Sequence, residues 1–366
     1  MARNKNLNSA ARAKKDEFYT QLTDIEAELK HYVQHFKDKI VLCNCDDPYE
    51  SYFFKYFAMH FNDLGLKKLI TTCYVGSPIA QMEFDFFGTP NENPNFDKNK
   101  SAIMFEVNEV RDWNGDGRTD LADVKYLLQN NSNSITYLEG DGDFRSDECI
   151  AALKQADIVV TNPPFSLFRE YVAQLIEYNK KFLIIGNINC ITYKEIFPLI
   201  MENKIWLGNG MGRAISGFIV PETYELYGTE ARISKEGKRI VSTNQCLWLT
   251  NLDFEKRHEE ITLYKSRAAE PELFPRYDNY DAIEVPRTEY IPKDYYGVMG
   301  VPITFLDKYN PDQFEIIGAT ESEGSGFSNG LWHETSSFRQ AVIHGKKVYK
   351  RLFIRRKSGE AAESEN

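Results

Sequence analysis

Short apolar runs alternate with amphipathic segments over the first two hundred residues. Five runs have the length and continuity of buried strands, at 40–43, 69–75, 135–138, 158–161 and 182–185. Apolar positions recur at helical spacing in four segments, at 23–36, 51–61, 150–156 and 167–176. Strands that alternate with helices favour an α/β fold with a mostly parallel, doubly wound sheet.

The pattern changes after about residue 200, where Gly-rich turns and short aromatic strands replace it. We therefore predict a catalytic domain at 1–200, interrupted by an insertion at about 76–134 that begins with a Pro-, Asn- and Asp-rich stretch. A smaller mixed region follows at 201–357. The tail at 358–366 is acidic and lacks large apolar groups, so we expect it to be disordered.

Composition agrees with a globular protein that has a large aromatic core. The chain has 366 residues, is 42% hydrophobic and contains 24 Phe and 21 Tyr. No stretch approaches the roughly 18 apolar residues of a membrane span, and the N-terminus does not resemble a signal peptide. The six Cys form neither a CxxC pair nor a disulfide ladder. These features predict a cytoplasmic protein with free thiols and no membrane partner.

Charge is distributed unevenly. A net charge of −10 argues against an indiscriminate nucleic-acid binder. Basic residues nevertheless gather near both ends, at Arg3, Lys5, Arg12, Lys14 and Lys15, and at Lys346, Lys347, Lys350, Arg351, Arg355, Arg356 and Lys357. Such clusters are more often solvated surface, but two of them around an acidic body fit a protein that meets phosphate along one face.

The most informative motif is Asn162-Pro163-Pro164-Phe165, which directly follows the apolar run 158–161. A polar residue there lies at the carboxyl edge of a sheet, where open α/β folds bind ligands. Each proline fixes its own φ and lacks a backbone donor, so the turn is stiff. The first proline also keeps Asn162 out of helical geometry. The result is a rigid bracket that presents one amide, one carbonyl and one aromatic face.

Such a bracket suits chemistry on an exocyclic amine. The amino nitrogen of adenine is a poor nucleophile because its lone pair is delocalised into the ring. The Asn162 side-chain oxygen and the Pro163 carbonyl could accept its two N–H groups while Phe165 stacks on the ring. The alternative is an ordinary Pro-Pro turn capped by Asn. The strand–turn–helix context favours the catalytic interpretation, so we predict Asn162, Pro163 and Phe165 as catalytic residues.

Acidic and amide side chains follow two of the predicted strands. A methyl donor such as S-adenosylmethionine needs groups at the carboxyl ends of the strands to receive its hydroxyls and ammonium. Asn44, Asp46 and Asp47 follow the first strand and meet that need, whereas Asp143 could accept from the amino group of the cofactor's adenine and Phe144 could pack on its ring. Each could instead be a helix N-cap or a turn residue. The first turn lacks the Gly-x-Gly of a dinucleotide site, which counts against an oxidoreductase.

A second motif has the spacing of a calcium loop. Oxygen-bearing residues stand at positions 1, 3, 5, 9 and 12, with Gly at position 6: Asp112, Asn114, Asp116, Asp120 and Asp123. Asp rather than Glu closes the loop, and no clear entering helix precedes it. We predict a structural calcium site there, with a turn that holds no ion as the alternative.

These motifs, in this order, resemble the class I S-adenosylmethionine-dependent DNA adenine methyltransferases, and within them the EcoRI-type modification methylases. The segments that carry the resemblance are 16–20, 43–48, 140–146, 157–171, 216–222, 247–251 and 297–305. The resemblance implies a Rossmann-like fold, S-adenosylmethionine as cofactor and a C-terminal target-recognition region. In this resemblance, Asn162, Pro163 and Phe165 correspond to the family's catalytic motif. Phe18, Tyr19 and Thr20 correspond to its N-terminal cofactor motif.

The family's reaction is methyl transfer to N6 of a flipped adenine in duplex DNA, as the modification half of a restriction–modification system. GAATTC is a plausible target, and a cognate endonuclease sharing that site is a possible partner without a stable complex. Arg213 and Trp248 are candidates for reading the bases. Two alternatives stay open: methylation of RNA or of a protein glutamine, and a non-catalytic DNA-binding regulator. Intact Asn162 and Phe165 speak against the regulator.

Overall fold

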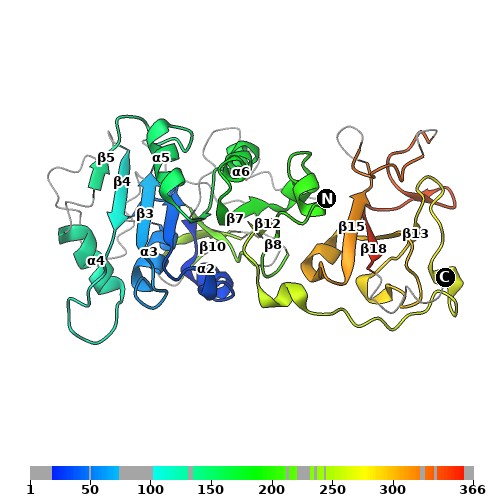
Figure 1. Ribbon diagram of the computed structural model, residues 1–366, viewed down its shortest axis with the longest axis horizontal. Coiled ribbons are helices and arrows are strands. Elements are labelled where there is room, and N and C mark those ends of the chain that lie inside the picture. The colour runs from blue at the N-terminus through cyan, green and yellow to red at the C-terminus, as the bar shows by residue number, and fades with distance from the viewer. Residues whose placement is uncertain are drawn as a thin grey trace. The chain divides into compact units, whose positions relative to one another are not determined.

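The computed structural model describes residues 19–48, 51–73, 102–130, 135–211, 214–220, 231–234, 237–242, 245–321, 326–333 and 336–357. The chain forms two compact units (Figure 1). The first contains residues 1–188 and 208–252, and the second contains residues 189–207 and 253–366. This division differs from the predicted boundary at residue 200, because 208–252 returns to the first unit. The predicted tail at 358–366 lies outside the described residues, as does Phe18.

Seven strands of the first unit lie side by side in the order β5-β4-β3-β2-β6-β7-β12. Their bounds are β2 Ile40–Asn44, β3 Lys68–Cys73, β4 Ile103–Val107, β5 Ile135–Tyr137, β6 Ile158–Thr161, β7 Lys181–Asn187 and β12 Cys246–Thr250. The four central strands, β3, β2, β6 and β7, are parallel. The strands β4, β5 and β12 are antiparallel to their neighbours. The sheet is therefore mixed, with the predicted parallel arrangement confined to its centre.

The five predicted strands are confirmed, and β4 and β12 are additional. The central strands are buried: Val41, Leu42, Val159, Val160 and Ile184 have no exposed surface. Burial on both faces explains their continuous apolar runs. The strand β4 lies within the predicted insertion, and its burial alternates along the strand. The strand β4 lies between β3 and β5, and β12 lies beside β7, so the extra strands extend the sheet on either side of its parallel centre.

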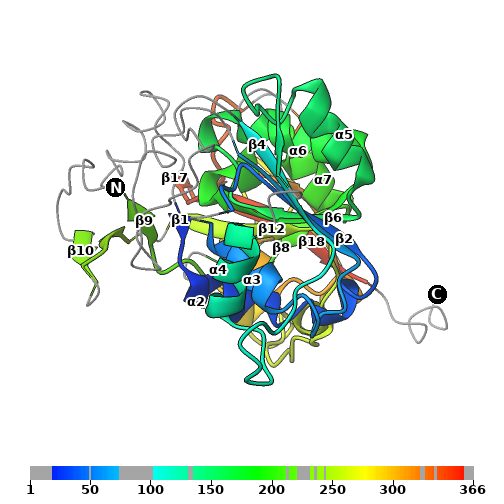
Figure 2. The same cartoon turned by 90° about the vertical axis from the view of Figure 1, so that its left-hand side faces the viewer.

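Helices cover both faces of this sheet. Their bounds are α2 Leu22–Leu29, α3 Tyr52–Met59, α4 Leu121–Asn130, α5 Asp147–Gln155 and α6 Phe168–Glu177. Figure 2 shows α5 and α6 on one side and α2, α3 and α4 on the other. The aromatic helix α3 begins at Ser51, whose hydroxyl accepts from the backbone N–H groups of Phe53 and Phe54. The helix α2 ends at Leu29, earlier than predicted, and η1 (Val33–His35) follows it.

A small antiparallel sheet completes the first unit. Its strands are β1 Tyr19–Thr20, β9 Phe218–Val220, β10 Ala231–Ile233 and β11 Arg239–Val241, in the order β1-β9-β11-β10. Thr20 lies opposite Phe218 in this sheet. It is tied to α2 because the Asp24 carboxylate accepts hydrogen bonds from the backbone and hydroxyl of Ser216. The N-terminal segment is thereby joined to residues two hundred positions later.

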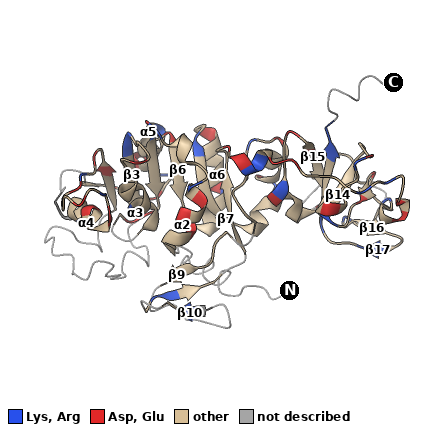
Figure 3. Cartoon of the chain, turned by 90° about the horizontal axis from the view of Figure 1, so that it is seen from below, with Lys and Arg blue, Asp and Glu red and all other residues tan. Residues whose placement is uncertain are grey.

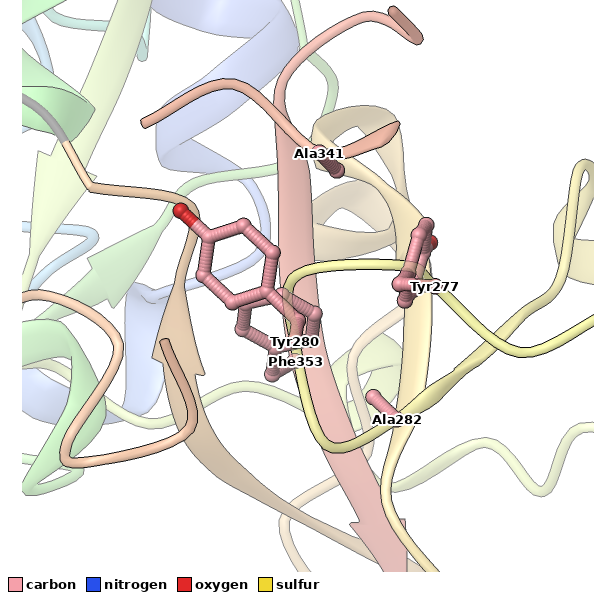
Figure 4. Packing of buried hydrophobic residues seen from close by; sticks show 5 residues of the cluster. All are labelled: Tyr277, Tyr280, Ala282, Ala341 and Phe353. Carbon is pink, nitrogen blue, oxygen red and sulfur yellow. The ribbon is translucent and has the colours of Figure 1, made fainter. Parts of the chain in front are cut away.

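The second unit is built on a four-stranded sheet in the order β13-β14-β18-β15, with a separate hairpin, β16-β17. Strand bounds are β8 Trp206–Leu207, β13 Ile283–Glu284, β14 Met299–Pro302, β15 Phe314–Ala319, β16 Val342–Ile343, β17 Lys346–Lys347 and β18 Arg351–Arg356. The helical segments are η4 Ile188–Thr192, α7 Phe197–Met201, η6 Glu255–His258, η7 Pro271–Leu273, η8 Thr288–Tyr290 and η9 Ile303–Lys308. Aromatic rings and alanines form a buried cluster beside β18, made of Tyr277, Tyr280, Ala282, Ala341 and Phe353 (Figure 4).

Part of the C-terminal basic cluster is structural. Arg351 is buried, and its guanidinium lies 2.6 Å from Oε1 of Glu284 on β13. The hydroxyl of Tyr277 donates to the same carboxylate. Burial raises the pKa of Tyr277, so the phenol stays protonated and remains a donor. Arg355 pairs with Glu315 of β15 at 2.5 Å. These two arginines therefore hold the second sheet together.

A second charged cluster lies where η6 meets the turn before β15. The ring nitrogens of His258 lie 2.6 Å from Oδ2 of Asp312 and 2.9 Å from Oδ2 of Asp253. Hydrogen bonds to these two carboxylates raise the pKa of His258 above its ordinary value. The charged imidazole thus links two segments of the second unit.

Candidate active site

The first candidate site lies at the switch point of the central sheet. The strands β2 and β6 are neighbours, and the chain continues from β2 to β3 on one side and from β6 to β7 on the other. Ligands of open α/β sheets bind in the crevice at such a point, outside the carboxyl ends of the strands. Asn44 is the last residue of β2, and Asn162 follows the last residue of β6. Two of the predicted site residues are therefore at adjacent positions on one edge.

Hydroxyl groups fix the loop after β2. The Thr161 hydroxyl lies 2.6 Å from Oδ2 of Asp46 and also contacts the carbonyl oxygen of Asn44. The Ser51 hydroxyl donates to the other oxygen of Asp46 at 2.7 Å. The Asp46 carboxylate is 5% exposed, so these donors replace water around a buried charge. Asp47 is also buried, and its carbonyl accepts the N–H of Ser51 at the start of α3.

Tyr171 of α6 connects two of the predicted cofactor residues. The Tyr171 hydroxyl donates to Oδ1 of Asn44. The Tyr171 ring packs edge-on against the Phe144 ring at a centroid distance of 5.0 Å. Complete burial raises the pKa of Tyr171, so the phenol stays protonated. From the sequence, Tyr171 is predicted only to be an apolar position of a helix. Its helical spacing was the available signal, and nothing in the sequence pairs it with Asn44.

The loop that carries Asp143 packs against the end of β3. Gly142 has a φ of +79°, and an added Cβ would lie 2.3 Å from the carbonyl oxygen of Cys73. Only glycine fits such a position without displacing the backbone. The Asp143 carboxylate accepts from Arg145 at 2.6 Å, and this hydrogen bond lowers the pKa of Asp143. Asp143 is therefore an ionised group with a fixed orientation at the same edge of the sheet.

The predicted bracket has the expected strand–turn–helix form. Asn162 is 9% exposed, both prolines are buried, and Phe165 is half-buried. Phe165 opens the turn η3 (Phe165–Leu167), which leads into α6. Its ring lies 6.2 Å from that of Phe218, inclined at 65°. Because Phe218 lies opposite Thr20, the N-terminal motif and the bracket are linked through β9.

The predicted calcium loop is held by its own backbone. The Asp112 carboxylate accepts from the N–H groups of Gly115 and Gly117 at 2.7 Å each. The Asp123 carboxylate accepts from the N–H groups of Trp113 and Asp120 at 2.7 and 2.9 Å. The remaining three, Asn114, Asp116 and Asp120, also accept backbone N–H groups within the loop.

Among the described residues no group of three or more acidic, His or Cys side chains is arranged to hold a metal ion. The five side chains accept N–H groups of the loop, as the alternative of a closed turn requires, and the calcium site stays a prediction. The same spacing that fits an ion also fits a turn that is closed by Asx-type hydrogen bonds.

The two candidates for base recognition have different outcomes. Trp248 lies on β12 with no exposed surface, and its ring packs edge-on against Phe53 at a centroid distance of 5.9 Å. It is a core residue of the first unit, so the prediction that it reads bases is wrong. Arg213 lies outside the described residues.

No helix in the described part of the chain exceeds ten residues, which is too short to cross a membrane.

Asn162-Pro163-Pro164-Phe165 thus lies at the carboxyl end of β6, beside the end of β2. The family model for the adenine-specific methyltransferase EcoRI matches residues 6–357. The chain belongs to this family of adenine-specific methyltransferases. Methyltransferases of this type use S-adenosylmethionine as the methyl donor.

Three similar proteins are named Type II methyltransferases. The chain is 52% identical to M.EcoRI of Escherichia coli over 97% of its own length and 98% of that protein. It is 34% identical to M.MgeORF184P of Mycoplasma genitalium over 95% of its length and 98% of that protein. It is 35% identical to M.MpnI of Mycoplasma pneumoniae, covering 85% and 84% of the two chains. No solved structure gives a significant match.

Proposed function

We propose that this protein transfers a methyl group from S-adenosylmethionine to N6 of an adenine in duplex DNA. It would act in the cytoplasm as the modification half of a restriction–modification system. The observation that carries the proposal is the position of Asn162, buried at the carboxyl end of β6 beside the end of β2. The names of the three relatives support the biological role. A cognate endonuclease would share the DNA site without forming a stable complex.

We assign the first unit to the class I, Rossmann-like fold. Four central parallel strands, helices on both faces and a switch point between β2 and β6 support this assignment. We therefore assign the catalytic domain, predicted at 1–200, to residues 1–188 and 208–252. We assign target recognition and DNA binding to the second unit, which forms most of the region predicted at 201–357.

Eight residues are proposed to line the cofactor site: Phe18, Tyr19, Thr20, Asn44, Asp46, Asp47, Asp143 and Phe144. When it is bound, S-adenosylmethionine supplies an electrophilic methyl group on a positively charged sulfur. The acidic residues suit its hydroxyl and ammonium groups. Asp46 and Asp143 are already oriented by Thr161, Ser51 and Arg145, so they lose little freedom when a ligand binds.

The bracket would act on an adenine that has rotated out of the duplex. Flipping costs a few kcal/mol, and stacking on Phe165 would offset about 1–3 kcal/mol of that cost. The Asn162 side-chain oxygen and the Pro163 carbonyl would accept the two N6 hydrogens and draw the nitrogen towards a tetrahedral state. A bound S-adenosylmethionine would supply the methyl group to N6, and its sulfur would keep the electrons of the broken carbon–sulfur bond. N6 would then release one proton to water, and no nucleophilic side chain is required because positioning dominates the reaction.

The decisive experiment replaces Asn162 with Ala and measures single-turnover methylation of a duplex that contains GAATTC. We expect the rate constant to fall by about 100-fold or more, because one oriented polar group of an active site is lost. Binding of S-adenosylmethionine and of DNA should be retained. Asn108→Ala is the matched control, because Asn108 is exposed and follows β4 at the opposite edge of the sheet. An unchanged rate in Asn162→Ala would overturn the proposed catalytic role.

A substrate comparison tests the reaction itself. Labelled S-adenosylmethionine is incubated with the purified protein and with duplex DNA, RNA or a glutamine-containing protein. We expect label in N6-methyladenine of duplex DNA. Label only in RNA or in protein would assign the bracket to another planar amine or amide, and label in none would favour a non-catalytic DNA-binding role.

A further inference from the structure

The hairpin β16-β17 of the second unit is basic, because its second strand consists of Lys346 and Lys347 (Figure 3). Residues 336–350 contain no Asp or Glu but include Arg339, Lys346, Lys347 and Lys350. Ile343 lies opposite Lys346, so His344 and Gly345 form a two-residue loop. Both have positive φ, 48° and 74° respectively. Such turns match the twist of paired strands.

The backbone of this hairpin is anchored from a single segment. The side-chain nitrogen of Asn279 donates to the carbonyl oxygens of Phe338 and Gln340 at 2.8 and 2.9 Å. The side-chain oxygen of Asn279 accepts the N–H of Val342 at 2.9 Å. Asn279 is 3% exposed, so these bonds are protected from water. They fix both the approach to the hairpin and its first strand.

The neighbouring residue Asp278 closes the turn. Its carboxylate accepts the backbone N–H groups of His344 and Gly345 at 3.2 and 2.8 Å. On the other strand, the Val348 N–H donates to the Ala341 carbonyl at 2.9 Å. A hairpin held in this way has little conformational freedom left to lose when it binds a partner.

The lysines of β17 differ from Arg351 and Arg355 in their charge partners. Arg351 and Arg355 are ion-paired with Glu284 and Glu315. Lys346 and Lys347 are exposed, and no carboxylate of the described residues pairs with either. The ammonium of Lys347 lies 4.2 Å from the centre of the Phe338 ring, which is 46% exposed. This cation–π contact orients the charge without neutralising it.

We propose that the β16-β17 hairpin binds the phosphate backbone of duplex DNA through Lys346 and Lys347. This proposal rests on the proposed function, which makes duplex DNA the substrate. Charge complementarity favours DNA, since two unpaired lysines on a chain of net charge −10 define a local positive surface. A two-stranded ribbon also has the dimensions that the major groove admits. Contacts to phosphate position a protein on the duplex without reading its sequence.

The test is the salt dependence of DNA binding by the full chain. The double variant Lys346→Gln/Lys347→Gln and the wild type are titrated with a fluorescent duplex between 0.1 and 0.4 M salt (about the range in which binding is measurable). Each lost phosphate contact lowers the slope of log K against log salt by about 0.9, so we expect a decrease of about 1.8. If the affinities converge at 1 M salt, binding at 0.1 M weakens by about 60-fold. Duplexes with and without the target site should be affected equally.

The control is Lys204→Gln/Lys308→Gln, which changes the net charge by the same amount. Both lysines are exposed and paired, with Glu202 at 2.7 Å and Glu289 at 3.2 Å. An unchanged slope in the hairpin variant would overturn the proposal, and so would an equal decrease in the control. Thermal melting checks that the hairpin variant is folded. Failure of the proposed function is separately visible, because the wild type would then not methylate DNA at all.

Discussion

Replacing Thr161 with Val tests how the loop after β2 is held. The Thr161 side chain is fully buried at the end of β6, and its hydroxyl lies 2.6 Å from a carboxylate oxygen of Asp46. Valine has nearly the same shape, so packing changes little. The substitution therefore removes a hydroxyl that lies between two acceptors, the Asp46 carboxylate and the Asn44 carbonyl oxygen. Asp46 is 5% exposed and keeps Ser51 as a donor.

The expected magnitude follows from the charge on the acceptor. A hydrogen bond to an ionised group contributes about 1.5–3 kcal/mol, and one between neutral groups about 0.5–1.5 kcal/mol. We expect Thr161→Val to lower the free energy of unfolding by about 1.5–3 kcal/mol, because the Asp46 carboxylate stays buried and loses one hydrogen bond. The control is Thr250→Val in β12, where the hydroxyl donates to the neutral carbonyl of Phe182 at 2.6 Å and accepts the N–H of Leu252 at 3.0 Å. The control should lose about 1 kcal/mol for each of these two hydrogen bonds.

Urea unfolding followed by circular dichroism measures both changes. Calorimetric titration with S-adenosylmethionine gives a second measurement, in which Thr161→Val should bind more weakly and Thr250→Val as tightly as wild type. Thr161→Ser restores the hydroxyl and should recover cofactor affinity. Unchanged cofactor binding by Thr161→Val, or an equal weakening in Thr250→Val, would refute the view that Thr161 stabilises a ligand-binding loop.

Three further predictions concern charged groups elsewhere. Arg351→Leu leaves Glu284 buried without its partner and should cost about 3–5 kcal/mol in urea unfolding, whereas Arg355→Leu at an exposed pair should cost no more than about 1 kcal/mol; similar costs would contradict this. Asp112→Ala should lower the melting temperature equally in EDTA and in calcium, and a calcium-induced rise in the wild type would show that an ion is bound. The pKa of His258 is raised in the folded state, so its contribution to stability is full below its ordinary value of 6.5 and is lost as pH rises through the folded pKa. His258→Gln should remove that part of the pH dependence in thermal melts, and an identical profile would count against it.

Several features of the fold and of the site could be predicted because they depend on neighbouring residues. The five apolar runs were confirmed as strands, since burial on both faces requires uninterrupted apolar positions. The strand–turn–helix form of the bracket also follows locally, because Pro163 and Pro164 restrict their own backbone. The Asp and Asn spacing at 112–123 closes a turn by accepting backbone N–H groups, and the calcium site stays a prediction.

The partners of these local elements were decided by the tertiary structure. Thr161 meets Asp46 across 115 positions, and Tyr171 meets Asn44 across 127. Trp248 has an aromatic side chain that could contact bases, but it lies in the core. Its strand adds to a sheet formed mostly from the first two hundred residues.

The sequence by itself determined the strands, the stiff bracket and the kind of chemistry that it suits, because hydrophobic period and proline geometry act over a few residues. Only the tertiary structure decided which side chains orient the bracket and the acidic loops, and which lysines remain exposed and unpaired on a rigid hairpin. Those outcomes depend on hydrogen bonds and ion pairs between distant segments, which no local pattern specifies.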